Sequence, residues 1–208
     1  MGIEEKLSQV PSYSKELGLD LIREEDRFKW FLASILFAKR ISSQIAKRTY
    51  EEFEKEDVVT PESILEASWD KLVEVLDSGG YVRYDFFTAS KLLEIASSLK
   101  ENYGSLEGLY AQARDSKDLE RKLLEFKGVG PTTVNIFLRE LKGIWEKAKP
   151  SLSPIAKEVA SKLGLSEKEL ELPNVESALV RIGLEFCKGK KCSACPVREE
   201  CFAWGKEA

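Results

Sequence analysis

The sequence predicts an all-α protein built from about ten short helices. Apolar residues recur with the helical period in one segment after another, and residues that commonly begin or end helices stand at the segment boundaries. No stretch alternates polar and apolar residues over several positions, as a half-buried strand would. The chain has 208 residues, 43% of them hydrophobic, which is enough for one large or two small domains with a core.

The first two predicted helices differ in character. The segment 28–39 carries a broad apolar face that includes Phe31, Leu32 and Leu36, which is typical of a core helix. The segment 42–56 is richer in charged residues and predicts a more exposed helix.

Capping residues mark the next helices. Thr60 is a candidate N-cap ahead of Pro61, and Ser68 begins the following helix, which Gly79 and Gly80 end. The remaining predicted helices span 88–104, 116–126, 132–141, 153–164 and 174–186.

Composition limits the classes of function. The 32 basic and 36 acidic residues give a formal net charge of -4, so a nucleic-acid surface must come from local basic clusters and backbone donors. Histidine is absent, so acid–base chemistry would rest on other side chains. The amino-terminal segment lacks an apolar signal sequence, and the longest apolar run, 30–38, is too short to cross a bilayer. We therefore expect a cytoplasmic protein without membrane contact.

All four cysteines lie in one short segment near the carboxyl end. Their spacing is Cys187-x4-Cys192-x2-Cys195-x5-Cys201. In a cytosolic protein, a clustered set indicates metal ligands rather than disulfides. The uneven spacing with a single C-x2-C pair favours an iron–sulfur cluster, and a zinc site is the alternative. Lysines and an arginine between and beside the cysteines would offset an anionic cluster, namely Lys188, Lys190, Lys191 and Arg198.

The second motif is the stretch "GVGPTTVNIF", which starts at Gly128 between two predicted helices. Glycines let the backbone approach a ligand closely, and free N–H groups at a helix start attract an anion. Pro131 stands at the first helical position, and Lys127 with Thr132 or Thr133 can add donors to a phosphate. A tight turn between helices without a ligand is the alternative.

These motifs resemble the helix-hairpin-helix DNA glycosylase superfamily, in particular its endonuclease III-like branch with a carboxy-terminal 4Fe–4S cluster. The segment 28–53 resembles the helix and loop that open the family's six-helix barrel, and 78–96 resembles its second DNA-facing turn. The segment 126–135 matches its hairpin, and 187–201 matches its cluster loop.

The resemblance implies two helical domains that flank a DNA cleft. The six-helix barrel would span 23–142, with the helix-hairpin-helix at about 117–141, and the cluster domain would combine 1–22 with 143–208. In this family a damaged base is flipped into the cleft. We expect a monomer that binds damaged double-stranded DNA and associates with the nucleoid when bound.

The chain differs from the family at the positions of the family's catalytic residues. Thr132 stands where family members with lyase activity carry a lysine, and Ser153 stands where the family carries its catalytic aspartate. Ser153 still suits the N-cap of its helix. Lys39 replaces the glutamine that usually enters the DNA stack, and the first gap between cysteines is shorter than usual.

Two residues are candidates for the missing chemistry. Lys39, beside Arg40, could supply the amine of a Schiff-base lyase, and its alternative role is contact with a phosphate. Asp85 is the candidate carboxylate, and its alternative role is to cap the next helix. The turn before Asp85 could stack on bases and hold the backbone through Tyr81, Arg83 and Tyr84. The residues expected to contact DNA are Lys39, Arg40, Arg83, Tyr84, Lys127, Gly128, Val129, Gly130, Thr132 and Thr133.

These observations predict a DNA-binding protein of the base-excision-repair type, namely an atypical DNA glycosylase or abasic-site lyase. The alternative is an inactive endonuclease III-like protein that binds damaged or distorted DNA without cleaving it. A redox or structural iron–sulfur protein without DNA contact is disfavoured, because the hairpin and the cysteine loop occur together.

Overall fold

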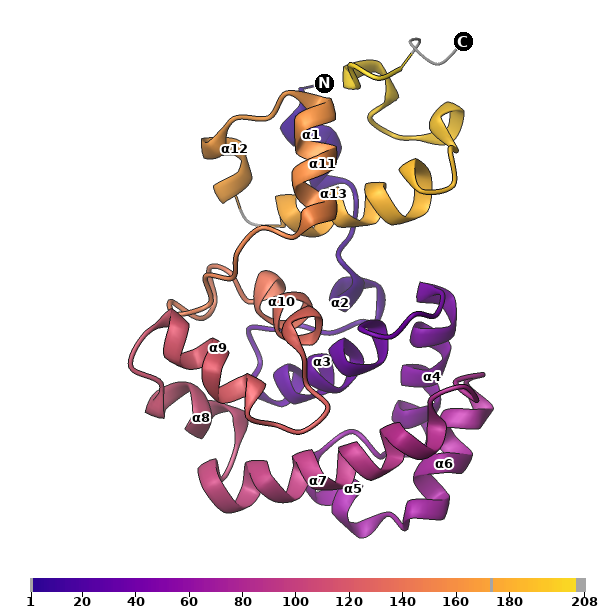
Figure 1. Cartoon of the computed structure of the whole chain (residues 1–208), viewed down its shortest axis with the longest axis vertical. Helices are drawn as coiled ribbons and strands as arrows, with labels where there is room; N and C mark the ends of the chain where they lie inside the picture. Colours follow the sequence, from indigo (N-terminus) through magenta and orange to yellow (C-terminus); the bar gives the residue numbers. More distant parts are fainter. Residues whose placement is uncertain (1, 173, 205–208) are drawn as a thin grey trace. The chain divides into compact units, whose positions relative to one another are not determined.

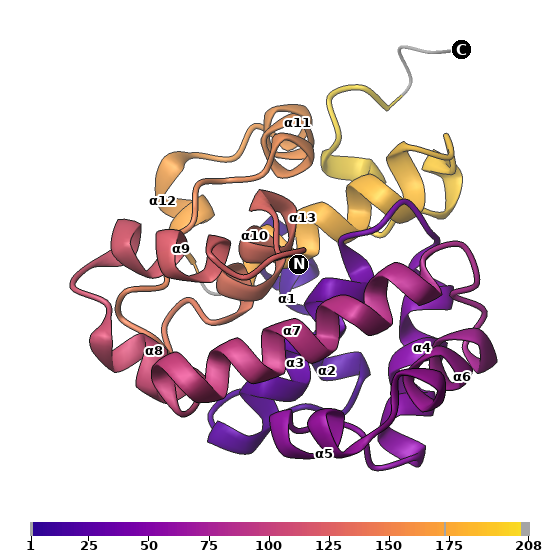
Figure 2. The ribbon, with the colours of Figure 1, turned by 60° about the horizontal axis from the view of Figure 1, so that its bottom comes forward.

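The computed structural model describes residues 2–172 and 174–204, and the described chain contains helices and connecting segments but no strand (Figures 1 and 2). The all-α prediction is therefore confirmed. The chain divides into two compact units. We call Leu17–Pro150 the central unit, and Met1–Glu16 together with Ser151–Ala208 the terminal unit.

The central unit holds the helices from α3 to α10. Their bounds are α3 Glu24–Phe37, α4 Ser43–Lys55, α5 Pro61–Glu66, α6 Trp69–Ser78, α7 Asp85–Tyr103, α8 Leu106–Gln112, α9 Ser116–Leu124 and α10 Pro131–Glu140. Helix α3 packs against α4 and α10, and α7 packs against α5 and α6.

Aromatic side chains join α3 to α10 in the core of the central unit. Trp30 and Phe31 are fully buried, as the apolar face of 28–39 predicts. The Trp30 indole N–H donates to the carbonyl of Phe137 at 3.2 Å, and the rings of Phe31 and Phe137 meet edge to face at 5.1 Å. Because edge-to-face pairs add to the burial of apolar area, this contact holds α10 at a defined position on α3.

The predicted caps are present. The Thr60 hydroxyl accepts from the Ser63 amide at 3.0 Å, and the Ser68 hydroxyl accepts from the Lys71 amide at 3.1 Å. Gly79 is the C-cap of α6 and lies directly against α4, where a Cβ would come within 2.3 Å of Thr49, and Gly80 follows with a positive φ of 90°. Short helices that sequence patterns did not predict are α1, α2, α8 and α12.

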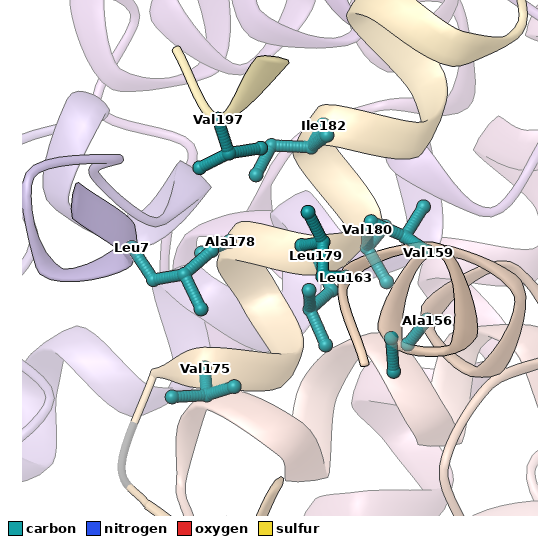
Figure 3. Close-up of a cluster of buried hydrophobic side chains, with 11 residues drawn as sticks. Leu7, Ala156, Val159, Leu163, Val175, Ala178, Leu179, Val180, Ile182 and Val197 are labelled. Atoms are coloured by element: carbon teal, nitrogen blue, oxygen red, sulfur yellow. The ribbon is translucent and has the colours of Figure 1, made fainter. Parts of the chain in front are cut away.

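The terminal unit is assembled from both ends of the chain. It contains α1 Ile3–Ser8, α2 Tyr13–Glu16, α11 Pro154–Leu163, α12 Glu167–Glu171 and α13 Val175–Ile182, followed by short π and 3-10 turns. Figure 3 shows its core, in which side chains from α1, α11 and α13 meet Val197 of the cysteine loop. The cysteine loop therefore rests on the apolar core of this unit.

The first turn of α9, the helix that precedes the hairpin turn, contains a buried carboxylate. Asp118 accepts from the Arg114 amide at 3.0 Å and from the Arg121 guanidinium at 2.5 Å. The backbone donor and then the two arginines hold the pKa of Asp118 well below its ordinary value. A carboxyl whose folded pKa is depressed contributes stability above its unfolded pKa of about 4, and this contribution disappears as pH falls through the folded pKa.

We therefore expect Asp118→Asn to lower the melting temperature at pH 7 and to have progressively less effect below about pH 4. Thermal unfolding followed by circular dichroism from pH 7 to pH 2 measures the difference. Glu66→Gln, at an exposed carboxylate of α5, is the matched control and should change little at either pH. An effect of Asp118→Asn that stays constant across this range would contradict the assignment.

Candidate nucleic-acid interface and cysteine loop

The hairpin turn between α9 and α10 has the geometry of an open anion-binding corner. Gly128 adopts a positive φ of 100°, and the Val129 amide returns to the Phe126 carbonyl at 3.0 Å. Pro131 is the first residue of α10, and its N-cap, Gly130, provides no side-chain cap. The first amides of the helix therefore have no acceptor within it, and they carry the positive end of the helix dipole.

The two glycines of the turn are present for different reasons. A Cβ at Gly128 would come within 2.8 Å of the Lys91 side chain, on a backbone that L-residues rarely adopt. Gly130 has a φ of -111°, and a Cβ there would meet nothing within 4 Å. The folded chain thus requires glycine at 128 but not at 130. The open space above Gly130 leaves room for an external group to approach the backbone.

The residues expected to contact a phosphate at this corner differ in how exposed their side chains are. Thr132 is exposed, whereas the side chains of Thr133 and Val129 are buried and cannot reach a phosphate, and the Val129 amide already donates to the Phe126 carbonyl. The Lys127 side chain is 77% exposed, and its ammonium lies 3.9 Å from the Glu94 carboxylate.

Lys91 of α7 joins this corner to the rest of the interface, and sequence patterns did not single it out. Its ammonium contacts both carboxylate oxygens of Glu94 at 2.9 Å, and its aliphatic chain lies against Gly128. The same ammonium lies 5.5 Å from the centre of the Phe87 ring. The only sequence signal was an i,i+3 charge pair on a helix, which most often marks a solvated face.

Lys39 follows the end of α3 and shares the Phe87 ring with Lys91. Its ammonium lies 5.0 Å from the ring centre, at a cation–π distance. Burial lowers the pKa of Lys39 from its ordinary value. Among the described residues, no carboxylate lies within ion-pair distance of its ammonium. The structure therefore brings Lys39 to the hairpin through Phe87 and Lys91, with exposed Arg40 directly after it.

A buried tyrosine anchors the turn before α7 in the core of the central unit. Tyr81 is fully buried, and its hydroxyl donates to the Leu36 carbonyl at the end of α3 at 3.2 Å. The expectation that Tyr81 stacks on bases is therefore wrong, because its ring fills the core. Arg83 is exposed, and its guanidinium lies 5.5 Å from the centre of the Tyr84 ring.

Asp85 is the first residue of α7 rather than its cap. Tyr84 occupies the N-cap position without a side-chain cap, and the Asp85 carboxylate accepts from the Phe86 amide at 2.7 Å. Asp85 also lies beside Asp77 of α6. Burial, together with the hydrogen bond and the negative charge from Asp85, raises the pKa of Asp77.

In the terminal unit, Ser153 caps α11 as predicted. Its hydroxyl accepts from the Ala156 amide at 3.4 Å, and its own amide donates to the Glu176 carboxylate at 3.0 Å. Glu176 is buried, and sequence patterns did not connect it with Ser153. A buried carboxylate thus supports the backbone at the position where the resembled family carries its catalytic aspartate.

The four cysteines are free thiols with intermediate exposure. Cys187 ends a π-turn, Cys192 begins a 3-10 turn, Cys195 follows that turn, and Cys201 follows the next one. The Phe202 amide donates to the carbonyl of Lys162 in α11 at 2.8 Å, which ties the end of the loop to its own unit. Burial and the neighbouring thiolate charges raise the pKa of Cys187, although the Lys162 charge opposes the shift.

Within residues 2–172 and 174–204, no three His, Cys, Asp or Glu side chains converge so that they could hold one metal ion. In the same described part of the chain, no helix is long and apolar enough to cross a membrane.

Comparison with known proteins places the fold. No family model matches the chain. The solved structure of a trapped endonuclease III–DNA covalent intermediate, the estranged-adenine complex, aligns with a TM-score of 0.52 at 17% identity, over 100% of this chain and 99% of the other. The chain has the endonuclease III fold. The fold that the predicted resemblance implies is therefore confirmed.

A curated relative extends the similarity to the sequence. The protein named "Putative DNA repair glycosylase MJ1434" of Methanocaldococcus jannaschii is 26% identical over 199 residues, which cover 86% of this chain and 87% of the relative. The endonuclease III fold and this sequence similarity therefore both extend over most of the chain.

Proposed function

We propose that this chain binds damaged double-stranded DNA as a monomer and acts in base excision repair, as an atypical DNA glycosylase or abasic-site lyase. The observation that carries the proposal is the open corner at Gly130, where α10 begins without a side-chain cap and a Cβ would meet nothing within 4 Å. A phosphodiester oxygen is the anion that such a corner accepts. Lys127, Arg40 and Arg83 are exposed cations of the same unit. The similarity to the proteins above supports the same conclusion.

Lys39 is the proposed nucleophile for a lyase activity. A lysine with a lowered pKa and no carboxylate partner holds a larger fraction of neutral amine near neutral pH. Its nitrogen would attack the aldehyde carbon of an abasic sugar, form a C=N bond and release water. Loss of a proton from the adjacent sugar carbon to solvent would then expel the 3′ phosphate by β-elimination, and water would hydrolyse the C=N bond to release the lysine.

We expect wild-type protein to form a borohydride-trapped adduct with a duplex that contains an abasic site, and Lys39→Arg to form none. Arginine keeps the positive charge but lacks a nucleophilic primary amine, so DNA binding should stay within about threefold. The adduct is measured as a shifted band in denaturing electrophoresis. Lys91→Arg, at the other lysine on the Phe87 ring, is the matched control and should still be trapped. An adduct that persists in Lys39→Arg would exclude Lys39 as the nucleophile.

A binder without catalysis is the second candidate function, and a specific observation favours it. Thr132 offers no amine in the hairpin, and the Ser153 position carries a cap whose nearby carboxylate, Glu176, is buried. Tight binding to abasic, uracil-containing and oxidised duplexes, with neither base release nor strand scission, would select this alternative.

We also propose a 4Fe–4S cluster in the cysteine loop. The donor set fits: four free thiols lie within residues 187–201 on an apolar floor that includes Val197. Each thiolate of such a cluster binds a different iron, so the four need not converge on one ion as zinc ligands do. The residues that would hold the cluster are Cys187, Cys192, Cys195 and Cys201. Bound there, the cluster would supply either structural support or one-electron chemistry, and iron analysis with absorption near ~400 nm would separate it from zinc.

A further inference from the structure

Three aromatic rings of the central unit face solvent at the start of α7. Phe86 is 60% exposed, Phe87 is 51% exposed and Trp69, at the start of α6, is 38% exposed. Exposed rings that are grouped in this way are uncommon on a surface that has no partner. The fold already buries Tyr81 in this region, so the exposure of these rings does not reflect a general lack of apolar space.

The rings are held in place rather than loosely attached. The Trp69 indole N–H donates to the Ser90 hydroxyl at 2.9 Å, and that hydroxyl donates to the Phe86 carbonyl at 2.9 Å. The Trp69 and Phe86 rings lie 5.3 Å apart at an interplanar angle of 39°. A ring surface that is fixed before binding loses little conformational freedom when a flat partner stacks on it.

Two cations border one of these rings, Phe87. The ammonium groups of Lys39 and Lys91 lie 5.0 Å and 5.5 Å from the centre of the Phe87 ring. Lys91 also touches Gly128, so the aromatic rings and the hairpin corner are neighbours within one unit. An apolar protein partner that covered Phe87 would have to desolvate the Lys39 ammonium without replacing its water, whereas Lys91 already pairs with Glu94.

Resting on the proposed DNA binding, we propose that Phe86, Phe87 and Trp69 form a stacking surface for unpaired nucleobases. A nucleotide satisfies both features of this surface, because its base stacks on a ring while its phosphate pairs with a neighbouring ammonium. The preferred partner is therefore DNA whose bases are unpaired around a lesion or in a short bubble. In a fully paired duplex the base faces are covered by their neighbours and cannot reach the rings.

The test compares two fluorescein-labelled duplexes that differ only in a central bubble of a few mismatched pairs. Wild-type protein is expected to bind the bubble about tenfold more tightly than the intact duplex. The double substitution Phe86→Ala with Phe87→Ala is expected to remove that preference, so that the variant binds the bubble and the intact duplex with equal affinity. Ile22→Ala, at a residue of the same unit that is 73% exposed, is the matched control and should keep the preference.

A second measurement uses the protein's own fluorescence and does not depend on the double variant. Trp30 and Trp145 are buried, so in a Trp204→Phe background Trp69 is the exposed tryptophan. Bubble DNA is expected to quench its emission, and intact duplex is not.

The outcomes separate the two proposals. Failure to bind either duplex would overturn the proposed function together with the stacking surface. Binding without a preference for the bubble, or a preference that survives in the double variant, would overturn the stacking surface alone. An unquenched Trp69 in the presence of saturating bubble DNA would overturn it as well. Capture of a protein partner on the three rings, with no effect of bubbles, would indicate a protein-docking surface instead.

Discussion

Gly130→Ala is expected to weaken binding to duplex DNA by about tenfold or more while the protein remains folded. The new methyl group would occupy the space in which a phosphate oxygen approaches the first amides of α10. Nothing in the folded chain lies within 4 Å of that methyl group, and the φ of -111° suits alanine. The free energy of unfolding should therefore change by less than about 1 kcal/mol, because glycine is only moderately better than alanine as an N-cap.

The neighbouring glycine provides the contrast. Gly128→Ala places a Cβ on a backbone with a φ of 100° and within 2.8 Å of Lys91, so it should cost about 1–3 kcal/mol of stability as well as DNA affinity. Fluorescence anisotropy with duplex DNA and urea unfolding of both variants measure the two effects separately. Unchanged DNA affinity in Gly130→Ala would show that the corner does not hold the backbone.

Arg181→Ala is expected to destabilise the terminal unit by about 3 kcal/mol. The Arg181 side chain is 9% exposed, and its guanidinium contacts Glu16 at 2.6 Å, Glu185 at 2.8 Å and the Pro11 carbonyl at 2.7 Å. It also lies 4.8 Å from the centre of the Tyr13 ring. Removing it leaves two partly buried carboxylates without their shared cation, and it removes the polar contacts that join residues 11 and 16 to α13.

The expected destabilisation by Arg181→Ala lies at the lower end of the range for broken buried ion pairs, because both glutamates keep some contact with water. Arg23→Ala, at a solvent-exposed arginine paired with Glu25, is the matched control and should change the free energy of unfolding little, because water screens an exposed pair. Urea unfolding monitored by circular dichroism measures both variants. A cost for Arg181→Ala equal to that of the control would show that the network does not hold the amino-terminal segment.

Helix positions and caps could be read from the sequence because their signals are local. Thr60 and Ser68 bond amides only three residues ahead, and Pro131 marks the start of α10 by its own geometry. The short helices α8 and α12 were missed because seven or fewer residues carry too little periodicity to stand out.

Around the start of α7, the types of the residues did not show which side chains are exposed. Tyr81 and Phe86 are both aromatic and lie five positions apart, yet the first is fully buried and the second is mostly exposed. The difference arises because the Tyr81 hydroxyl reaches the end of α3, whereas the Phe86 ring lies at the surface in a tilted contact with Trp69.

The sequence by itself determined the all-α class, the glycine turn, the clustered cysteines, and the presence of Thr132 and Ser153 where the resembled family carries its catalytic groups. Only the tertiary structure decided that Lys39 and Lys91 share the Phe87 ring beside Gly128, and that Glu176 supports Ser153. The physical reason is the distance along the chain over which each effect acts. Turn geometry and capping act over a few residues, whereas burial and charge pairing depend on which helix faces the rest of the chain covers.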